Sequence, residues 1–251
     1  MEDRNTPINF TDYTVVDSAK GTRTMAKTFM ANVFLWMFAA LGISAFCAYL
    51  FASTPTLMLS LINETTGGLN PLGWVVMFAP LGFVLTMSFA FNRLSAAAMV
   101  GFFIAYAAVT GVSLSFILLI YTTGSVISCF AAASLMFGIM AVMGYTTDKD
   151  LTSFGRILTM GLIGIVIASL INMFIGSDRM GYIISIVGVA VFTGLTAYDV
   201  QKLKRIGEGI EYEGASAADT KKLSIMGALT LYLDFINLFL MLLRLFGGRR
   251  D

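Results

Sequence analysis

Seven long runs of apolar residues limit what this chain can fold into more than any other feature. Each contains the ~20 residues that an α-helix needs to cross a hydrocarbon core of about 30 Å. Because lipid offers no partner to backbone N–H and C=O groups, each run is expected to be helical. The sequence therefore predicts an all-α membrane protein with seven transmembrane helices. The runs lie at roughly 26–53, 71–91, 96–121, 125–145, 155–175, 180–200 and 223–246.

Composition supports this class and excludes others. Of the 251 residues, 57% are hydrophobic and 12% are charged, whereas about a quarter of a soluble domain is charged. A net charge of +1 indicates no nucleic-acid partner, so the expected partner is the lipid bilayer. The chain has no histidine, the commonest general base and metal ligand. Cys47 and Cys129 lie inside apolar runs and are interpreted as small hydrophobic residues.

Motifs typical of enzymes are absent from the sequence. It contains no Walker loop, no G-x-S-x-G, no C-x-x-C and no H-E-x-x-H. We therefore expect a protein that is not an enzyme and that holds no cofactor. Residues 1–25 are interpreted as a flexible cytoplasmic tail, 26–246 as the transmembrane domain and 247–251 as a short C-terminal tail. The mixed-charge stretch 201–222 is interpreted as a solvated cytoplasmic loop.

Lysine and arginine predict the orientation in the membrane. The segments before the first span and after the second, fourth and sixth hold 12 of the 16 basic residues, and the segments between them hold one. Basic residues concentrate on the cytoplasmic side, which predicts a cytoplasmic N-terminus. The remaining three, Arg244, Arg249 and Arg250, lie outside if the last span crosses fully. A re-entrant last span would keep them inside, but we prefer a full crossing because 223–246 is long and predominantly apolar.

Ionisable residues at membrane depth are costly and commonly functional. Asp199 closes the sixth run, and Asp234 lies near the middle of the seventh. A structural interpretation of Asp199 is an interfacial acid near Lys202. Arg93, after the second run, is interpreted either as a cytoplasmic anchor or as a partner of Asp199 on the same membrane side. Asp199 is three residues from Lys202, whereas Asp234 is twelve residues from Lys222. At 1.5 Å per residue their depths in the membrane differ by roughly 13 Å. The two acids meet only if the last helix is displaced along its axis.

Three motifs resemble those of one family of multipass membrane proteins. They are "GYTTDKDLTSFG" (144–155), "GLTAYDVQKLK" (194–204) and "LTLYLDFINLFL" (229–240). In this order they resemble the bacterial branch of the Bax inhibitor-1 family, from the first span to the last. The resemblance implies a location in the bacterial cytoplasmic (inner) membrane. It also implies that the last helix is enclosed by the other six, which would permit the axial displacement.

The same resemblance implies a pH-sensitive calcium leak governed by two aspartates on the last two helices. Those positions fall on Asp199 and Asp234, and the family's arginine partner falls on Arg93. Two carboxylates in a low-dielectric interior share a proton and titrate in two separate steps. Calcium prefers carboxylate and carbonyl oxygens, so Asp199 and Asp234 are candidates for weak or transient calcium binding, with calcium as the transported ion.

Two other functional classes remain open from the sequence. One is a regulator that binds other membrane proteins, such as a membrane-embedded protease or a respiratory complex, as part of the family does. The other is a proton-coupled transporter, which also requires buried carboxylates. Calcium flux through the purified protein separates the first interpretation from the regulator, and uphill transport driven by a proton gradient would support the transporter.

Overall fold

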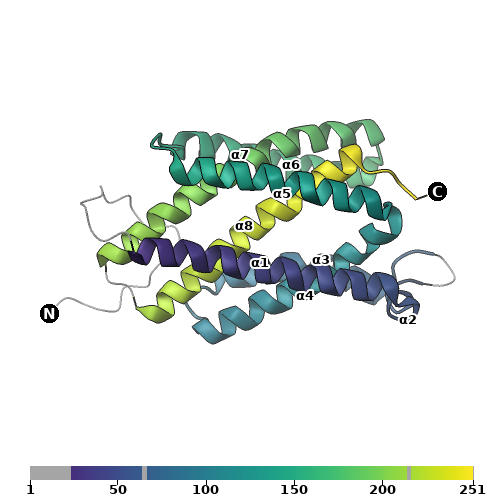
Figure 1. Cartoon of the computed structure of the whole chain (residues 1–251). Helices are drawn as coiled ribbons and strands as arrows, with labels where there is room; N and C mark the ends of the chain where they lie inside the picture. Colours follow the sequence, from purple (N-terminus) through teal and green to yellow (C-terminus); the bar gives the residue numbers. More distant parts are fainter. Residues whose placement is uncertain (1–23, 64–66, 214–215, 251) are drawn as a thin grey trace. The chain divides into compact units, whose positions relative to one another are not determined.

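The computed structural model describes residues 24–63, 67–213 and 216–250, most of which are helical. Within these residues, seven helices are long and apolar enough to cross a membrane, which confirms the predicted fold class. The prediction of a tail at residues 1–25 lies largely outside the described residues. The helices are α1 (Thr24–Ser53), α2 (Pro55–Leu59), α3 (Pro71–Phe89), α4 (Ala96–Ile120), α5 (Thr123–Thr146), α6 (Thr152–Ile175), α7 (Asp178–Glu213) and α8 (Ala217–Phe246) (Figure 1).

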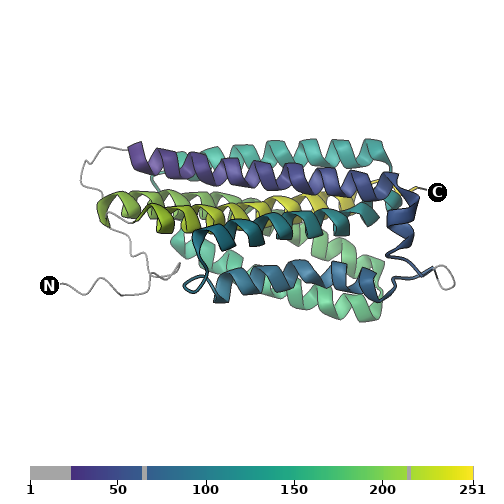
Figure 2. The ribbon, with the colours of Figure 1, turned by 90° about the horizontal axis from the view of Figure 1, so that it is seen from below.

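The helix α7 continues well past its predicted end at residue 200, so the prediction of a solvated loop over 201–222 is wrong. Its ribbon runs unbroken in both views (Figures 1 and 2). The side chains of Leu203, Ile206 and Ile210 are all less than 5% exposed. They follow one another at helical spacing, which makes one face of this polar stretch apolar. Burial of that face explains why the helix persists among charged residues.

The last span, α8, is a single helix of 30 residues and about 45 Å. It passes through Gly227 without interruption, so it contains no turn of the kind that a re-entrant hairpin needs. In its most apolar 18-residue stretch 72% of the residues are buried, more than in any other of the seven spans. The last helix is therefore packed mainly against protein and not against lipid.

The chain divides into two compact units. The first takes its described residues from Met1–Leu118 and Arg205–Leu229, and the second from Leu119–Lys204 and Thr230–Asp251. The helices α7 and α8 contribute to both. Asp199 and Asp234 consequently belong to the second unit.

In the first unit, α1, α3 and α4 are joined by hydroxyl groups that bond to backbone carbonyls. Ser44 Oγ donates to Ala107 O at 2.6 Å, and Ser113 Oγ donates to Val76 O at 2.7 Å. Gly111 lies so close to the backbone of Ser44 that a Cβ there would overlap it. Small residues thus let these helices approach closely, as is typical of membrane helices.

In the second unit, the C-terminal segment is bound to the connection between α4 and α5. The Thr122 N–H donates to Gly248 O at 3.0 Å, and the Arg250 N–H donates to Ile120 O at 2.8 Å. Gly248 N–H in turn donates to Ser125 Oγ at 2.9 Å. The residues interpreted as a short C-terminal tail are therefore fixed to the protein as far as Arg250.

Candidate functional site

Within the second unit, α7 and α8 run antiparallel and in close contact. Asp199 contacts Asp234, and eleven residues earlier on α7, Gly188 contacts Met241. A Cβ on Gly188 would lie 2.8 Å from Met241 Cγ, so a larger residue would require the Met241 side chain to move. Positions 188 and 199 share one face of α7 because eleven residues make close to three turns. That face is directed at α8.

The two aspartates are joined side chain to side chain. Their carboxyl groups hydrogen-bond to each other. Asp234 is 5% exposed, and Asp199 is partly exposed. A hydrogen bond between two carboxyl groups requires a proton on at least one of them. The role predicted for this pair of acids stays a prediction.

Removing that proton leaves two negative charges in contact, which is unfavourable in a buried site. Asp234 has little to offset this charge, since its Oδ2 is buried without a hydrogen-bond partner in the described part of the chain. Lys202, three residues further along α7, is the cation whose charge acts on Asp199.

Aromatic rings surround the backbone of α8 beside Asp234. The ring of Phe235 packs edge-on against two rings of α5, with centroids 5.2 Å from Phe130 and 5.6 Å from Phe137. Phe130 also packs against Phe239, one turn further along α8, at 5.9 Å. These contacts hold α8 against α5.

Arg93 belongs to another unit of the chain than the two aspartates. It is exposed, in the turn between α3 and α4, and it belongs to the first unit. Its predicted pairing with Asp199 stays a prediction.

Two residues close to Asp199 were missed by the sequence analysis. Gln201 is 5% exposed, accepts a hydrogen bond from the Leu151 N–H at 2.9 Å and donates one to Lys149 O at 2.8 Å. Lys204 Nζ donates to Tyr145 O at 3.1 Å and lies 5.3 Å from the centroid of the Tyr145 ring. Their spacing of three residues places both side chains on one helix face, but a polar stretch offers no pattern that distinguishes them.

The aspartate pair supplies too few ligands for a tight metal site. No group of three or more His, Cys, Asp or Glu residues that could hold an ion occurs among residues 24–63, 67–213 and 216–250. Calcium takes six to eight oxygen ligands in its tight sites. Two aspartates alone fall short of that number.

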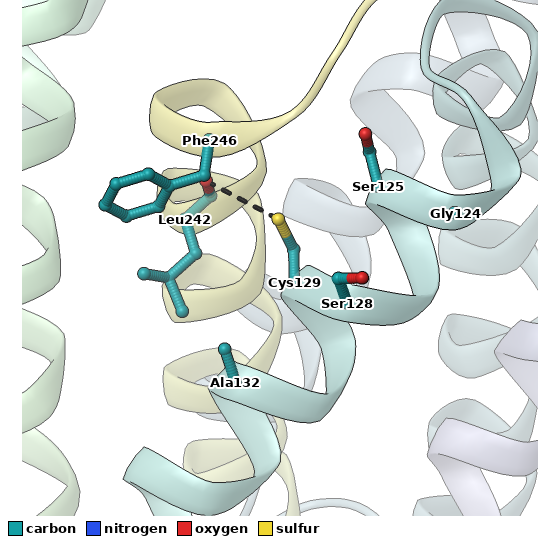
Figure 3. Close-up of a pocket in the computed structure, with 7 residues that line it drawn as sticks. All are labelled: Gly124, Ser125, Ser128, Cys129, Ala132, Leu242 and Phe246. Carbon is teal, nitrogen blue, oxygen red and sulfur yellow. Dashed lines mark hydrogen bonds between the residues drawn. The ribbon is translucent and has the colours of Figure 1, made fainter.

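A pocket of about 360 Å³ lies elsewhere in the second unit, between the first turns of α5 and the last turns of α8 (Figure 3). Within it, the Cys129 thiol contacts Leu242 O at 3.8 Å, and the side chains of Ser125 and Ser128 supply hydroxyl groups. The lining contains no acid or base, and neither Asp199 nor Asp234 contributes to it. The full lining is Gly124, Ser125, Ser128, Cys129, Ala132, Leu242 and Phe246.

A family model and individual relatives both match this chain over most of its length. A family described as "Inhibitor of apoptosis-promoting Bax1" matches residues 26–251. An Escherichia coli K12 protein named "Inner membrane protein YbhL" is 45% identical over 234 residues, which cover 93% of this chain and 97% of the relative.

Two uncharacterized proteins are also similar. One from Deinococcus radiodurans is 40% identical over 230 residues, covering 92% of this chain and 94% of the relative. One from Rickettsia prowazekii is 46% identical over 179 residues, covering 71% and 74%. The similarity to two of these relatives extends over nearly the whole chain, so it includes every membrane span.

Proposed function

The chain belongs to the Bax inhibitor-1 family, and we propose that it is a pH-sensitive calcium leak of the bacterial inner membrane, gated by Asp199 and Asp234. Under this proposal it has no enzymatic activity and needs no cofactor, and calcium is the ion that it transports. The observation that carries the proposal is the hydrogen bond between two carboxyl groups on neighbouring membrane-spanning helices.

Gating follows from the protonation of this pair. With a proton present, the carboxyl–carboxyl hydrogen bond ties α7 to α8. Without it, the two carboxylates repel each other, and the helices favour an arrangement that separates them. A local change of charge thereby biases a closed and an open state, as in other pH switches.

Conduction is attributed to the same carboxylates. Once ionised, they attract a divalent cation and present it with oxygen ligands. Two such groups bind calcium too weakly to retain it, which suits passage better than storage. Arg93 enters the proposal as the partner of ionised Asp199, because a guanidinium can bond both oxygens of a carboxylate.

The test is calcium flux through the purified protein in liposomes that contain a calcium-sensitive dye. Flux is measured across the physiological range, about pH 5 to 8, for the wild type and for Asp234→Asn. The matched control is Asp219→Asn, which changes a half-buried acid in the first turn of the same helix. We expect pH-dependent flux in the wild type and in the control, and a weakened pH dependence in Asp234→Asn.

Other outcomes identify the alternative functions. Absence of calcium flux at every pH would contradict the leak and favour a regulator that acts on another membrane protein. Accumulation of a solute against its gradient, driven by a proton gradient, would favour a proton-coupled transporter, since such a transporter also needs a buried acid that binds and releases protons.

A further inference from the structure

The amide of Gln201 joins α7 to the connection between α5 and α6. This buried side chain uses both ends of its amide, accepting from the Leu151 N–H and donating to Lys149 O. The two partners are backbone groups of one short segment, residues 147–151. A planar amide held at both ends fixes the distance and the angle between the helix and that segment.

Two further contacts lie on the same face of α7. Ala197, four residues before Gln201, packs directly on Gly144, where a Cβ would lie 2.8 Å from Ala197 Cα. Lys204, three residues after Gln201, bonds to Tyr145 O. The three residues Ala197, Gln201 and Lys204 thus form a line that is held by the end of α5 and by the connection that follows it.

Gln201 and Asp199 are directed to opposite sides of the helix. Two residues correspond to a rotation of about 200°, so Asp199 is directed at α8 while Gln201 is directed at the α5–α6 connection. Gln201 does not touch the carboxyl pair, but the rotation of α7 about its axis determines where Asp199 is directed. A rotation of about 20° would move a Cα by about 0.8 Å, more than the spread of ordinary hydrogen-bond lengths.

We propose that Gln201 is a positioning residue for the aspartate pair: its two bonds to the α5–α6 connection fix the rotation of α7 that brings Asp199 into hydrogen-bonding contact with Asp234. The geometric part of this proposal rests on the contacts of Gln201 alone. Its effect on calcium flux rests on the proposed function.

The test compares the full-length protein with Gln201→Met, which keeps the length of the side chain and removes both hydrogen bonds. The control is Asn172→Leu. Asn172 is a buried amide that also bonds to a connection, accepting from the Ser177 N–H at 3.1 Å, but it lies at the other end of the α6–α7 pair. Isotope-edited infrared spectra at one fixed acidic pH report the C=O band of the protonated carboxyl pair, and Asp234→Asn assigns it.

We expect Gln201→Met to shift this band toward the frequency of a carboxyl group without a hydrogen-bond partner, and Asn172→Leu to leave it in place. Gln201→Glu keeps the oxygen that accepts from the Leu151 N–H and loses the donor to Lys149 O, so it should restore part of the wild-type band. An unchanged band in a folded Gln201→Met protein would overturn the proposal. If Gln201→Met does not fold, Gln201→Glu decides, and an unchanged band in that variant has the same meaning.

Flux measurements separate this proposal from the proposed function. If the protein leaks calcium, Gln201→Met should raise flux several-fold in the condition where the wild type is closed, and it should add nothing when Asp199→Asn is already present. If the wild type leaks no calcium, the proposed function fails. The infrared comparison still decides the positioning role, because it needs no transported ion.

Discussion

Asp199 and Asp234 lie at nearly the same distance from the connection between α7 and α8. Asp199 precedes the end of α7 at Glu213 by 14 residues, and Asp234 follows the start of α8 at Ala217 by 17. At 1.5 Å per residue these distances are about 21 Å and 26 Å. Two antiparallel helices joined by a short connection therefore bring the acids together with an offset of only about 5 Å.

The first prediction concerns the two acids. Asparagine is nearly isosteric with aspartate and cannot ionise, so Asp199→Asn and Asp234→Asn should both fold and should both flatten the dependence of calcium flux on pH. The physical reason is that repulsion between the carboxylates needs both of them. The measurement is liposome flux across about pH 5 to 8.

The double variant makes this prediction sharper. Each single change already abolishes the repulsion between the two carboxylates. The calcium flux of the double variant Asp199→Asn/Asp234→Asn should therefore depend on pH at least as strongly as that of either single variant. If each single variant keeps the wild-type midpoint, the acids do not titrate as a pair, and Asp199 is then an ordinary polar residue of α7.

The second prediction concerns Arg93. If its guanidinium pairs with Asp199 in the closed state, Arg93→Ala should raise calcium flux several-fold where the wild type is closed. Arg93→Lys should restore the wild-type behaviour only in part, because an ammonium cannot bond both carboxylate oxygens. Lys221→Ala, which removes an exposed basic residue of α8, is the control. Equal flux in the wild type and Arg93→Ala would reduce Arg93 to an anchor on the cytoplasmic side.

The third prediction concerns the contact of α5 with α7. A Cβ on Gly144 would lie 2.8 Å from both Cα and C of Ala197, whereas a Cβ on Gly138 of the same helix would meet nothing within 4 Å. Gly144→Ala should therefore destabilise the protein by about 1–3 kcal/mol through overpacking. Gly138→Ala should be neutral or stabilise by up to about 1 kcal/mol, since alanine favours helices. Thermal unfolding in detergent measures both, and equal melting temperatures would refute the close contact.

The fourth prediction concerns topology. The distribution of basic residues predicts a cytoplasmic N-terminus, and seven spans then place the C-terminus outside the cytoplasm. A phosphatase that is active only outside the cytoplasm should work when fused after Asp251, and a fluorescent protein that matures only in the cytoplasm should not. The reverse pattern would contradict either the full crossing of the last span or the cytoplasmic N-terminus.

The sequence predicted the membrane spans well because lipid requires long apolar runs, and these are visible without any tertiary information. It failed for the end of α7. There Lys202 and Lys204 interrupt the apolar run, while Leu203 and Ile206 continue the buried face. Hydropathy along the chain averages over all faces of a helix, so it cannot distinguish a loop from a helix with one buried face. The roughly 13 Å displacement expected for the last helix arose from this error.

The sequence also revealed the two acids, since a carboxylate inside an apolar run is conspicuous. It did not reveal Gln201. A neutral amide in a polar stretch has no distinctive pattern, and its partners are backbone groups of Lys149 and Leu151. Backbone groups carry no sequence signature, so a contact of this kind becomes visible only when the chain is folded.

The length of α7 has a consequence for access to the protein from the side that is predicted to be cytoplasmic. Its 36 residues form a rod of about 54 Å, and the hydrocarbon core is about 30 Å thick. A typical tilt of about 20° shortens the projection by only a few ångströms. If α7 begins at one boundary of the hydrocarbon core, about 20 Å of the rod projects past the other boundary at its C-terminal end. A soluble protein that gripped this projecting end would apply torque to the same rigid rod that carries Asp199, without having to enter the membrane.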